Sequence, residues 1–173
     1  MSEKMDFGTF YFRTLKEGDI KEFADNMRTA DRRELKRWTG NHEAYELERA
    51  CTLSDVLWVG CKKDGTLLSM FGGKRANVLD ETGVIWELST EAVNKNKLLF
   101  AKASKVGFDL VCKSLPDVGE FYNYVDTEYQ AAVNWIEWLG GCLTATKFLG
   151  KCGGVFQQFI IGNPHFRVEE GED

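Results

Sequence analysis

The length and composition of the chain are those of an ordinary globular protein. With 173 residues, 43% hydrophobic residues and only two prolines, it can bury a core without a metal or a disulfide. The formal net charge of −5 disfavours general nucleic-acid binding, which requires a basic face. We expect a single domain, 1–173, with its core at about 8–163, disorder at Met1–Asp6 and an acidic tail at 168–173.

Hydropathy and cysteine usage predict a soluble intracellular protein. No apolar run approaches the roughly 18 residues that span a bilayer, and residues 1–4 are not followed by a hydrophobic signal segment. The five cysteines are odd in number and lack metal-ligand spacing, which favours free thiols and predicts no metal site. Cys142 and Cys152 are candidates for facing each other on adjacent strands, but we favour a packing role for both.

The first half of the chain predicts one strand, three helical segments and a hairpin. Asp19 is expected to cap the first helix, and the turn at Lys63-Asp64-Gly65 predicts antiparallel pairing of the two strands beside it. The expected elements are a strand at Phe10–Leu15, helices at Ile20–Met27, Ala30–Trp38 and Glu43–Cys51, and strands at Val56–Cys61 and Leu67–Gly73.

From Val84 onward, strands and helices alternate. The expected elements are strands at Val84–Ser89 and Phe121–Val125, helices at Val93–Ser114 and Thr127–Leu139, and a closing hairpin of Cys142–Phe148 and Val155–Ile161 around a Gly150–Gly154 turn. A strand-helix-strand-helix unit normally implies parallel strands with right-handed crossovers. The whole order predicts an α+β fold, with a mixed central sheet of about seven strands flanked by about four helices.

This order resembles the GNAT superfamily of acyl-CoA N-acyltransferases over about 150 residues. The resemblance includes Arg13-Thr14-Leu15-Lys16-Glu17-Gly18-Asp19 near the start and Leu139-Gly140-Gly141 after the last helix. It implies acetyl-CoA as a possible ligand, lying along Leu88 and Ser89, with its phosphates near Asn94, Lys95, Asn96 and Lys97 at the start of the long helix.

Two family landmarks are altered in this chain. Ser89–Leu98 contains no glycine, although the family brings its backbone close to phosphate with a glycine-rich loop there. In the next helix Ala132 matches the family pattern, but Ile136 stands where a tyrosine often protonates the leaving thiolate. Isoleucine cannot donate a proton. Whether the chain is an enzyme is left open by these residues.

The resemblance also implies two candidate catalytic bases. Glu87 lies on the strand where some members place a base, although strand alternation is compatible with an outward-facing or ion-paired side chain. Asp126 follows the next strand, where a helix cap or turn residue is the alternative interpretation. In the preceding helical region, Arg32, Arg33, Lys36 and Arg37 form a basic cluster, which is either a solvated face or an anion site on the side from which an amine would approach.

A narrower resemblance covers Val84–Ile161 and points to GNAT-like internal virion proteins of short-tailed phages. It rests on Trp86-x-Leu88-Ser89, the glycine-free helix start, Phe121–Val125, Trp138–Gly141 and Phe156-Gln157-Gln158-Phe159. It implies a non-catalytic or degenerate acyltransferase in the host cytoplasm or the virion, with a phage or host protein as partner. The alternative is an active acetyl-CoA-dependent N-acetyltransferase acting on a protein or small-molecule amine.

Overall fold

The computed structural model describes residues 4–77, 79 and 81–167. In chain order its elements are β1 (Lys4–Asp6), β2 (Phe10–Arg13), α1 (Asp19–Asn26), α2 (Thr29–Thr39), α3 (Glu43–Leu53), β3 (Val56–Lys62), β4 (Leu67–Asn77), β5 (Thr82–Ser89), the 3₁₀ helix η1 (Glu91–Lys95), α4 (Lys97–Ser114), β6 (Glu120–Asp126), α5 (Gln130–Trp138), β7 (Cys142–Leu149) and β8 (Val155–Gly162).

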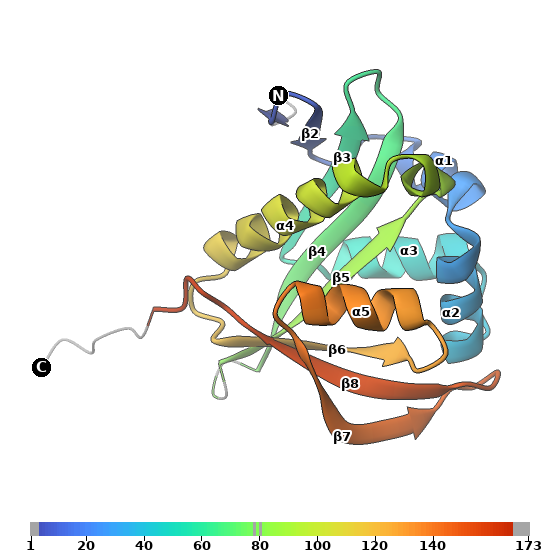
Figure 1. Cartoon of the computed structure of the whole chain (residues 1–173), viewed down its shortest axis with the longest axis vertical. Helices are drawn as coiled ribbons and strands as arrows, with labels where there is room; N and C mark the ends of the chain where they lie inside the picture. Colours follow the sequence, from blue (N-terminus) through green and yellow to red (C-terminus); the bar gives the residue numbers. More distant parts are fainter. Residues whose placement is uncertain (1–3, 78, 80, 168–173) are drawn as a thin grey trace, which may run out of the picture.

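The strands form one mixed sheet of eight strands in the order β1-β2-β3-β4-β5-β6-β8-β7 (Figure 1). Neighbouring strands are antiparallel except β5 and β6, which are parallel as the sequence predicted. The expected α+β fold is therefore confirmed. The expectation of disorder was wrong for Lys4–Asp6, which pairs with β2 and places the Lys4 ammonium 4.1 Å from the centre of the Tyr11 ring. Residues 1–3 and the acidic tail at 168–173 lie outside the described residues.

Helices cover both faces of the sheet (Figure 1). Each face has its own hydrophobic core. On the α4 face, Phe12, Phe71 and Val111 belong to one buried cluster. On the opposite face, Phe23 of α1 and Leu47 of α3 pack with Met70 of β4. Because successive side chains of a strand point to opposite faces, neighbouring residues of β4 contribute to both clusters.

Close packing of α4 on the sheet depends on Gly107. A Cβ at this position would lie 2.8 Å from the Phe71 ring, inside van der Waals contact. Glycine is therefore required where the helix crosses β4, although it costs about 1 kcal/mol of intrinsic helix propensity. This contact sets the depth at which α4 lies beside β5.

The starts of three helices differ from the sequence-based expectations. The N-cap of α1 is Gly18, not Asp19. Asp19 instead accepts two hydrogen bonds from the buried Arg13 guanidinium, at 2.6 and 2.9 Å, and one from the Lys16 backbone N–H at 2.7 Å. A buried arginine needs such a partner. The long helix α4 begins at Lys97 instead of Val93, because η1 occupies the preceding residues, and α5 begins at Gln130.

The cysteines are all free thiols, as expected. Cys51, Cys61 and Cys112 are buried, whereas Cys142 and Cys152 are exposed, so the packing role expected for these two was wrong. They also do not face each other on paired strands, because Cys142 lies opposite Ile160 and Cys152 lies in the β7–β8 turn. None of the helices in the described part of the chain is long and apolar enough to cross a membrane.

Candidate active site

The central feature of the sheet is a separation between its two parallel strands. β5 and β6 pair only at Thr82–Val84 and Glu120–Tyr122, and beyond these residues the strands diverge (Figure 1). The Asn123 side-chain amide donates to the Ile85 carbonyl at 2.8 Å, at the point where pairing stops. The remaining edge of β5, up to Ser89, therefore faces a gap in place of a neighbouring strand.

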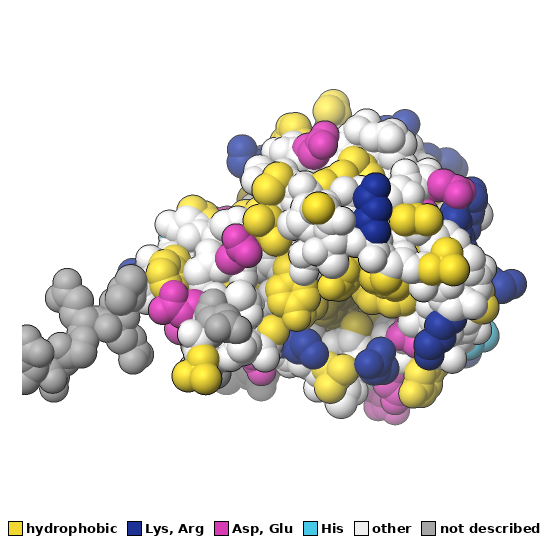
Figure 2. Space-filling view, turned by 90° about the horizontal axis from the view of Figure 1, so that it is seen from below, with side chains coloured by type: hydrophobic (Ala, Val, Ile, Leu, Met, Phe, Trp, Pro, Cys, Tyr) yellow, Lys and Arg dark blue, Asp and Glu magenta, His cyan; other side chains and the backbone are white. Residues whose placement is uncertain are grey.

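A cavity of about 820 Å³ occupies this gap and extends to both faces of the sheet. On the α2–α3 face its wall includes Glu34, Trp38 and Tyr124, and on the α4–α5 face it includes Glu87 and Trp135. Figure 2 shows a hollow lined mainly by hydrophobic side chains, with Lys and Arg side chains beside it. Its size and lining are typical of small-molecule sites.

Glu87, a candidate base from the sequence, lies in the wall of this cavity. Its Oε1 accepts a hydrogen bond from the Ser104 hydroxyl of α4 at 2.8 Å. Burial raises the pKa of Glu87 to about 7, although the hydrogen bond from Ser104 opposes that rise. The Trp135 indole N–H, also in the cavity wall, lies near enough to lower the pKa slightly, but it makes no hydrogen bond of normal geometry within the described residues.

Glu34 is a second carboxylate in the cavity wall, and the sequence analysis missed it. Its Oε1 accepts the Asp126 backbone N–H at 2.8 Å, and burial raises its pKa to about 7. A signal was present in the sequence: Asp31, Glu34, Leu35 and Trp38 recur at spacings of three and four residues, which places them on one side of α2. The basic residues of the same helix gave the more obvious pattern, and the anion site was predicted from them.

Asp31 ties α2 to the end of β5 and to the segment before α5. Its Oδ2 accepts the Ser89 backbone N–H and the Ser89 hydroxyl, both at 2.7 Å, and its Oδ1 accepts the Tyr129 hydroxyl at 2.9 Å. Asp31 is buried, and this burial raises its pKa. The Ser89 N–H is therefore engaged with α2, and the placement of acetyl-CoA along Leu88 and Ser89 stays a prediction.

Asp126, the other candidate base, is buried and has several partners. Its Oδ1 accepts the Glu128 backbone N–H at 3.0 Å, in the turn that precedes α5, and its Oδ2 lies 2.9 Å from the Arg37 guanidinium. The turn is what the alternative interpretation expected. These contacts hold the Asp126 carboxylate in the turn, and its role as a base, like that of Glu87, stays a prediction.

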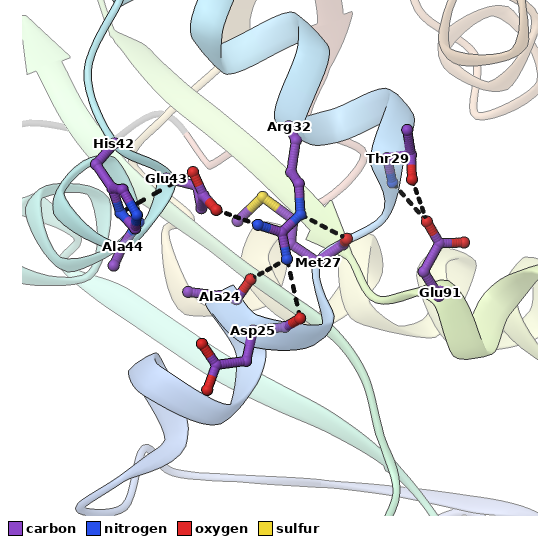
Figure 3. Close-up of polar contacts among 9 residues, drawn as sticks. All are labelled: Ala24, Asp25, Met27, Thr29, Arg32, His42, Glu43, Ala44 and Glu91. Carbon is purple, nitrogen blue, oxygen red and sulfur yellow. Dashed lines mark hydrogen bonds and ion pairs between the residues drawn. The ribbon is translucent and has the colours of Figure 1, made fainter.

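The basic cluster of α2 is engaged in internal contacts. Arg32 donates to the Met27 carbonyl at 3.1 Å and the Asp25 carbonyl at 3.0 Å at the end of α1, and it pairs with Glu43 at the start of α3 (Figure 3). Arg33 and Arg37 both bind Glu128, at 2.9 and 2.8 Å. Three of the four basic residues therefore join elements of the fold, and Arg33 and Lys36 are the exposed members of the cluster.

The expected phosphate site lies at the start of α4. Lys95 and Lys97 are exposed there, and the Asn94 side chain is bonded to Glu91 at 2.5 Å. Glu91 also accepts the backbone N–H and the hydroxyl of Thr29, both at 2.7 Å, so η1 is fastened to the start of α2 (Figure 3). The first amides of an α-helix have no internal acceptor and favour anions.

An aromatic stack joins the first turn of α4 to α5 beside the cavity. The rings of Phe100 on α4 and Trp135 on α5 are stacked, with centroids 5.2 Å apart, and Trp135 stacks in turn on Trp138 at 4.8 Å. Trp135 belongs to the cavity wall, and Ile136, at the position of the family tyrosine, lies beside it. A cofactor placed as the resemblance implies, from Lys95 and Lys97 into the cavity, would run past this stack.

Known proteins match this chain by structure and not by sequence. Neither a protein-family model nor a curated protein matches the sequence. Spermidine N-acetyltransferase from Vibrio cholerae, in complex with CoA and spermine, is 14% identical, with a TM-score of 0.66 over 91% of this chain and 97% of its own. Ribosomal-protein-S5-alanine acetyltransferase from Vibrio fischeri is 15% identical, with a TM-score of 0.67 over 96% of this chain and 100% of its own. An acetyltransferase of the GNAT family from Bacillus anthracis is 11% identical, with a TM-score of 0.65 over 93% of this chain and 99% of its own.

These matches show that the chain has the GNAT fold, which confirms the fold expected from the sequence. At identities of 11–15% they establish the fold alone. The narrower resemblance to phage proteins stays a prediction.

Proposed function

We propose that the protein is an acetyl-CoA-dependent N-acetyltransferase that acts on an amine held in the cavity between β5 and β6. The observation that carries this proposal is the pair of half-buried carboxylates, Glu34 and Glu87, in a cavity that crosses the sheet where the parallel strands separate. The similar structure from Vibrio cholerae has CoA bound, which supports this choice of acetyl donor.

The chemistry requires a neutral amine and a proton acceptor. An acetyl-CoA molecule would supply the acetyl group as a thioester. The amine nitrogen forms the new C–N bond while the C–S bond breaks, the proton lost by the amine passes to a carboxylate, and the CoA sulfur ends as a thiol after taking up one proton. A base with a pKa near the working pH performs such a transfer well.

Glu87 and Glu34 both meet that condition, because burial raises the pKa of each to about 7. The two carboxylates lie on opposite faces of the sheet. Glu87 faces α4, on the side of the expected cofactor, whereas Glu34 lies on α2, on the side from which the amine is expected to enter. We assign proton acceptance to Glu87, directly or through water, and orientation of the amine to Glu34.

Two exposed lysines would hold the cofactor phosphates in place of a glycine loop. Lys95 and Lys97 stand at the start of α4, where the helix dipole adds to their charge. A lysine acts as a point charge on a flexible stem, so it tolerates a phosphate that stays farther from the backbone. This arrangement supports weaker binding than a glycine-rich loop and does not need the Ser89 N–H.

A second candidate function is a non-catalytic one, in a phage virion or in contact with a host protein. The observations that favour it are the Phe100–Trp135 stack across the cofactor route and the exposed Trp138 and Leu98, with 53% and 88% of their surfaces accessible. Exposed tryptophans are frequent anchors of protein interfaces. Under this hypothesis the acyltransferase fold is a scaffold and the protein works in the host cytoplasm or the virion.

A transfer assay separates the two candidates. Release of CoA thiol from acetyl-CoA would be followed with a panel of small amines and short peptides, for the wild type and for Glu87→Gln. The proposal predicts amine-dependent release that Glu87→Gln lowers at least about tenfold, since general bases contribute that much or more. The matched control is Glu137→Gln, an exposed glutamate of α5 outside the cavity wall, which is expected to retain full activity. Unchanged turnover in Glu87→Gln would remove Glu87 from the mechanism.

A further inference from the structure

The wall of the cavity contains both acidic and basic side chains. Its two carboxylates with raised pKa values, Glu34 and Glu87, are half-buried where the strands diverge. The wall also contains two lysines, Lys74 and Lys151. Within the described residues, neither lysine forms an ion pair or a side-chain hydrogen bond, so both ammonium groups are available to a ligand.

The lysines belong to the α2–α3 side of the cavity. Lys74 lies on β4 opposite Val84, and the adjacent Gly73 faces the α4 core, where a Cβ would lie 2.7 Å from Val111. Strand alternation therefore points Lys74 to the other face, toward α3. Lys151 is in the β7–β8 turn, where its backbone N–H donates to the Trp38 carbonyl of α2 at 2.9 Å. Figure 2 shows Lys and Arg side chains beside the hollow.

One further cation of the wall is already compensated. Arg49 of α3 lies 3.5 Å from the buried Glu46, which also accepts the Asn41 side-chain amide at 2.5 Å. The Arg49–Glu46 pair is neutral as a unit, so the charges on this side that a ligand would meet are the two ammonium groups and the Glu34 carboxylate. Charged groups around a concave, apolar site focus their field on a ligand.

Aromatic rings lie in the same part of the wall. Trp38 packs against Tyr124 and Phe148, with centroids 6.2 and 5.9 Å apart, and all three line the cavity. A mainly apolar wall of aromatic rings accommodates the carbon skeleton of a ligand without adding charge. The complete surface thus offers a carboxylate for an ammonium group, an apolar wall, and two ammonium groups for an anion.

We propose that the acyl acceptor is an amine that also carries an acidic group, such as a short peptide or a protein N-terminus with a free α-amino group followed by acidic residues. The amine would lie toward Glu34 and Glu87, and the acidic group would lie against Lys74 and Lys151. This inference rests on the proposed acetyltransferase function, for which it names the substrate class. It differs from the polycation named for the Vibrio cholerae structure, because Lys74 and Lys151 would repel a polyamine.

Direct binding tests this inference without relying on turnover. Titration calorimetry at low salt would compare three tripeptides with free amino termini, Ala-Asp-Glu, Ala-Gln-Gln and Ala-Lys-Lys, and also spermidine. We expect Ala-Asp-Glu to bind about tenfold more tightly than Ala-Gln-Gln, with the difference shrinking at high salt, and no measurable binding of Ala-Lys-Lys or spermidine.

The double substitution Lys74→Gln with Lys151→Gln should remove most of that tenfold preference and leave Ala-Gln-Gln unaffected. The matched control is Lys147→Gln, an exposed lysine of β7 outside the cavity wall. Equal binding of the three peptides, preference for the basic ligands, or absence of any peptide binding would each overturn the inference. Acetyl-CoA binding, measured separately on the same samples, reports on the proposed function, so the two failures are distinguishable.

Discussion

The Asp31 carboxylate accepts both the backbone N–H and the hydroxyl of Ser89, each at 2.7 Å. These bonds hold the end of β5 against α2. A third bond, from the Tyr129 hydroxyl, attaches the start of α5 to the same carboxylate. Asp31 thus fixes the two sides of the gap in which the cavity lies.

The substitution Asp31→Asn should destabilise the fold. An asparagine has one acceptor oxygen where the aspartate has two, so its amide N–H₂ group would face a donor from Ser89 or Tyr129. A buried donor left without an acceptor costs about 1–3 kcal/mol in the free energy of unfolding. Urea denaturation would measure this loss. The control is Asp25→Asn, which removes an exposed ion pair with Lys21 and should leave the urea midpoint unchanged. An Asp31→Asn protein as stable as the wild type would show that the hydrogen bonds of Asp31 are dispensable.

Stability should depend on pH through Glu34 and Glu87. The pKa of each is raised from 4.5 to about 7 by burial, so the folded state prefers the protonated carboxyl. The wild type is therefore expected to lose stability as the pH rises from about 4.5 through about 7, because the folded protein then has to ionise a buried group.

Glu87→Gln imitates the protonated form and should remove part of this dependence. Compared with the wild type, the variant is expected to be more stable at pH 8, by on the order of 2–3 kcal/mol, and equally stable at pH 4.5. Urea unfolding at the two pH values would measure the difference, with Glu137→Gln as the exposed control. A Glu87→Gln protein that is less stable than the wild type at pH 8 would contradict the assignment of a raised pKa.

Phe100→Ala should open the route from the start of α4 to the cavity. The stacked ring of Phe100 on Trp135 is worth about 0.5–1.5 kcal/mol beyond the area it buries. Under the proposed function, a bound cofactor would have to displace it. Without the ring, acetyl-CoA should bind a few-fold more tightly, which calorimetry would detect. Weaker binding of acetyl-CoA to Phe100→Ala would contradict this prediction and would mean that the ring packs on the cofactor. The control is Leu98→Ala, at an exposed position of the same helix turn.

The sequence predicted the central part of the fold well because local patterns determine it. The order of strands and helices from Val84 to Gly141, the parallel pairing of β5 with β6 and the terminal hairpin all follow from hydrophobic periodicity and glycine turns. The start of α4 was misplaced because η1 and the first turn of a helix share the same local pattern. Lys4–Asp6 was misjudged because an edge strand depends on its partner more than on its own residues.

The site was harder to predict than the fold. Glu87 and Asp126 were found through the family resemblance, and the structure places Glu87 in the cavity and Asp126 in a turn with Arg37. Glu34 was missed because its role depends on α2 packing across the gap, a contact between segments 92 residues apart in the chain. The hydrogen bond from the Ser89 N–H to Asp31 likewise could not be predicted from the local sequence around either residue.

A thermal shift measurement would show whether the cavity belongs to an enzyme that binds acetyl-CoA. We would measure the Tm of the wild-type protein with and without acetyl-CoA at about 100 times an expected micromolar Kd, where a specific ligand adds about 2.7 kcal/mol to the stability of the folded state. For a chain of this size that corresponds to an increase of about 5–10 °C. We predict such an increase in Tm. A Tm that does not change at any acetyl-CoA concentration up to about 1 mM would contradict the enzyme hypothesis and favour the non-catalytic function.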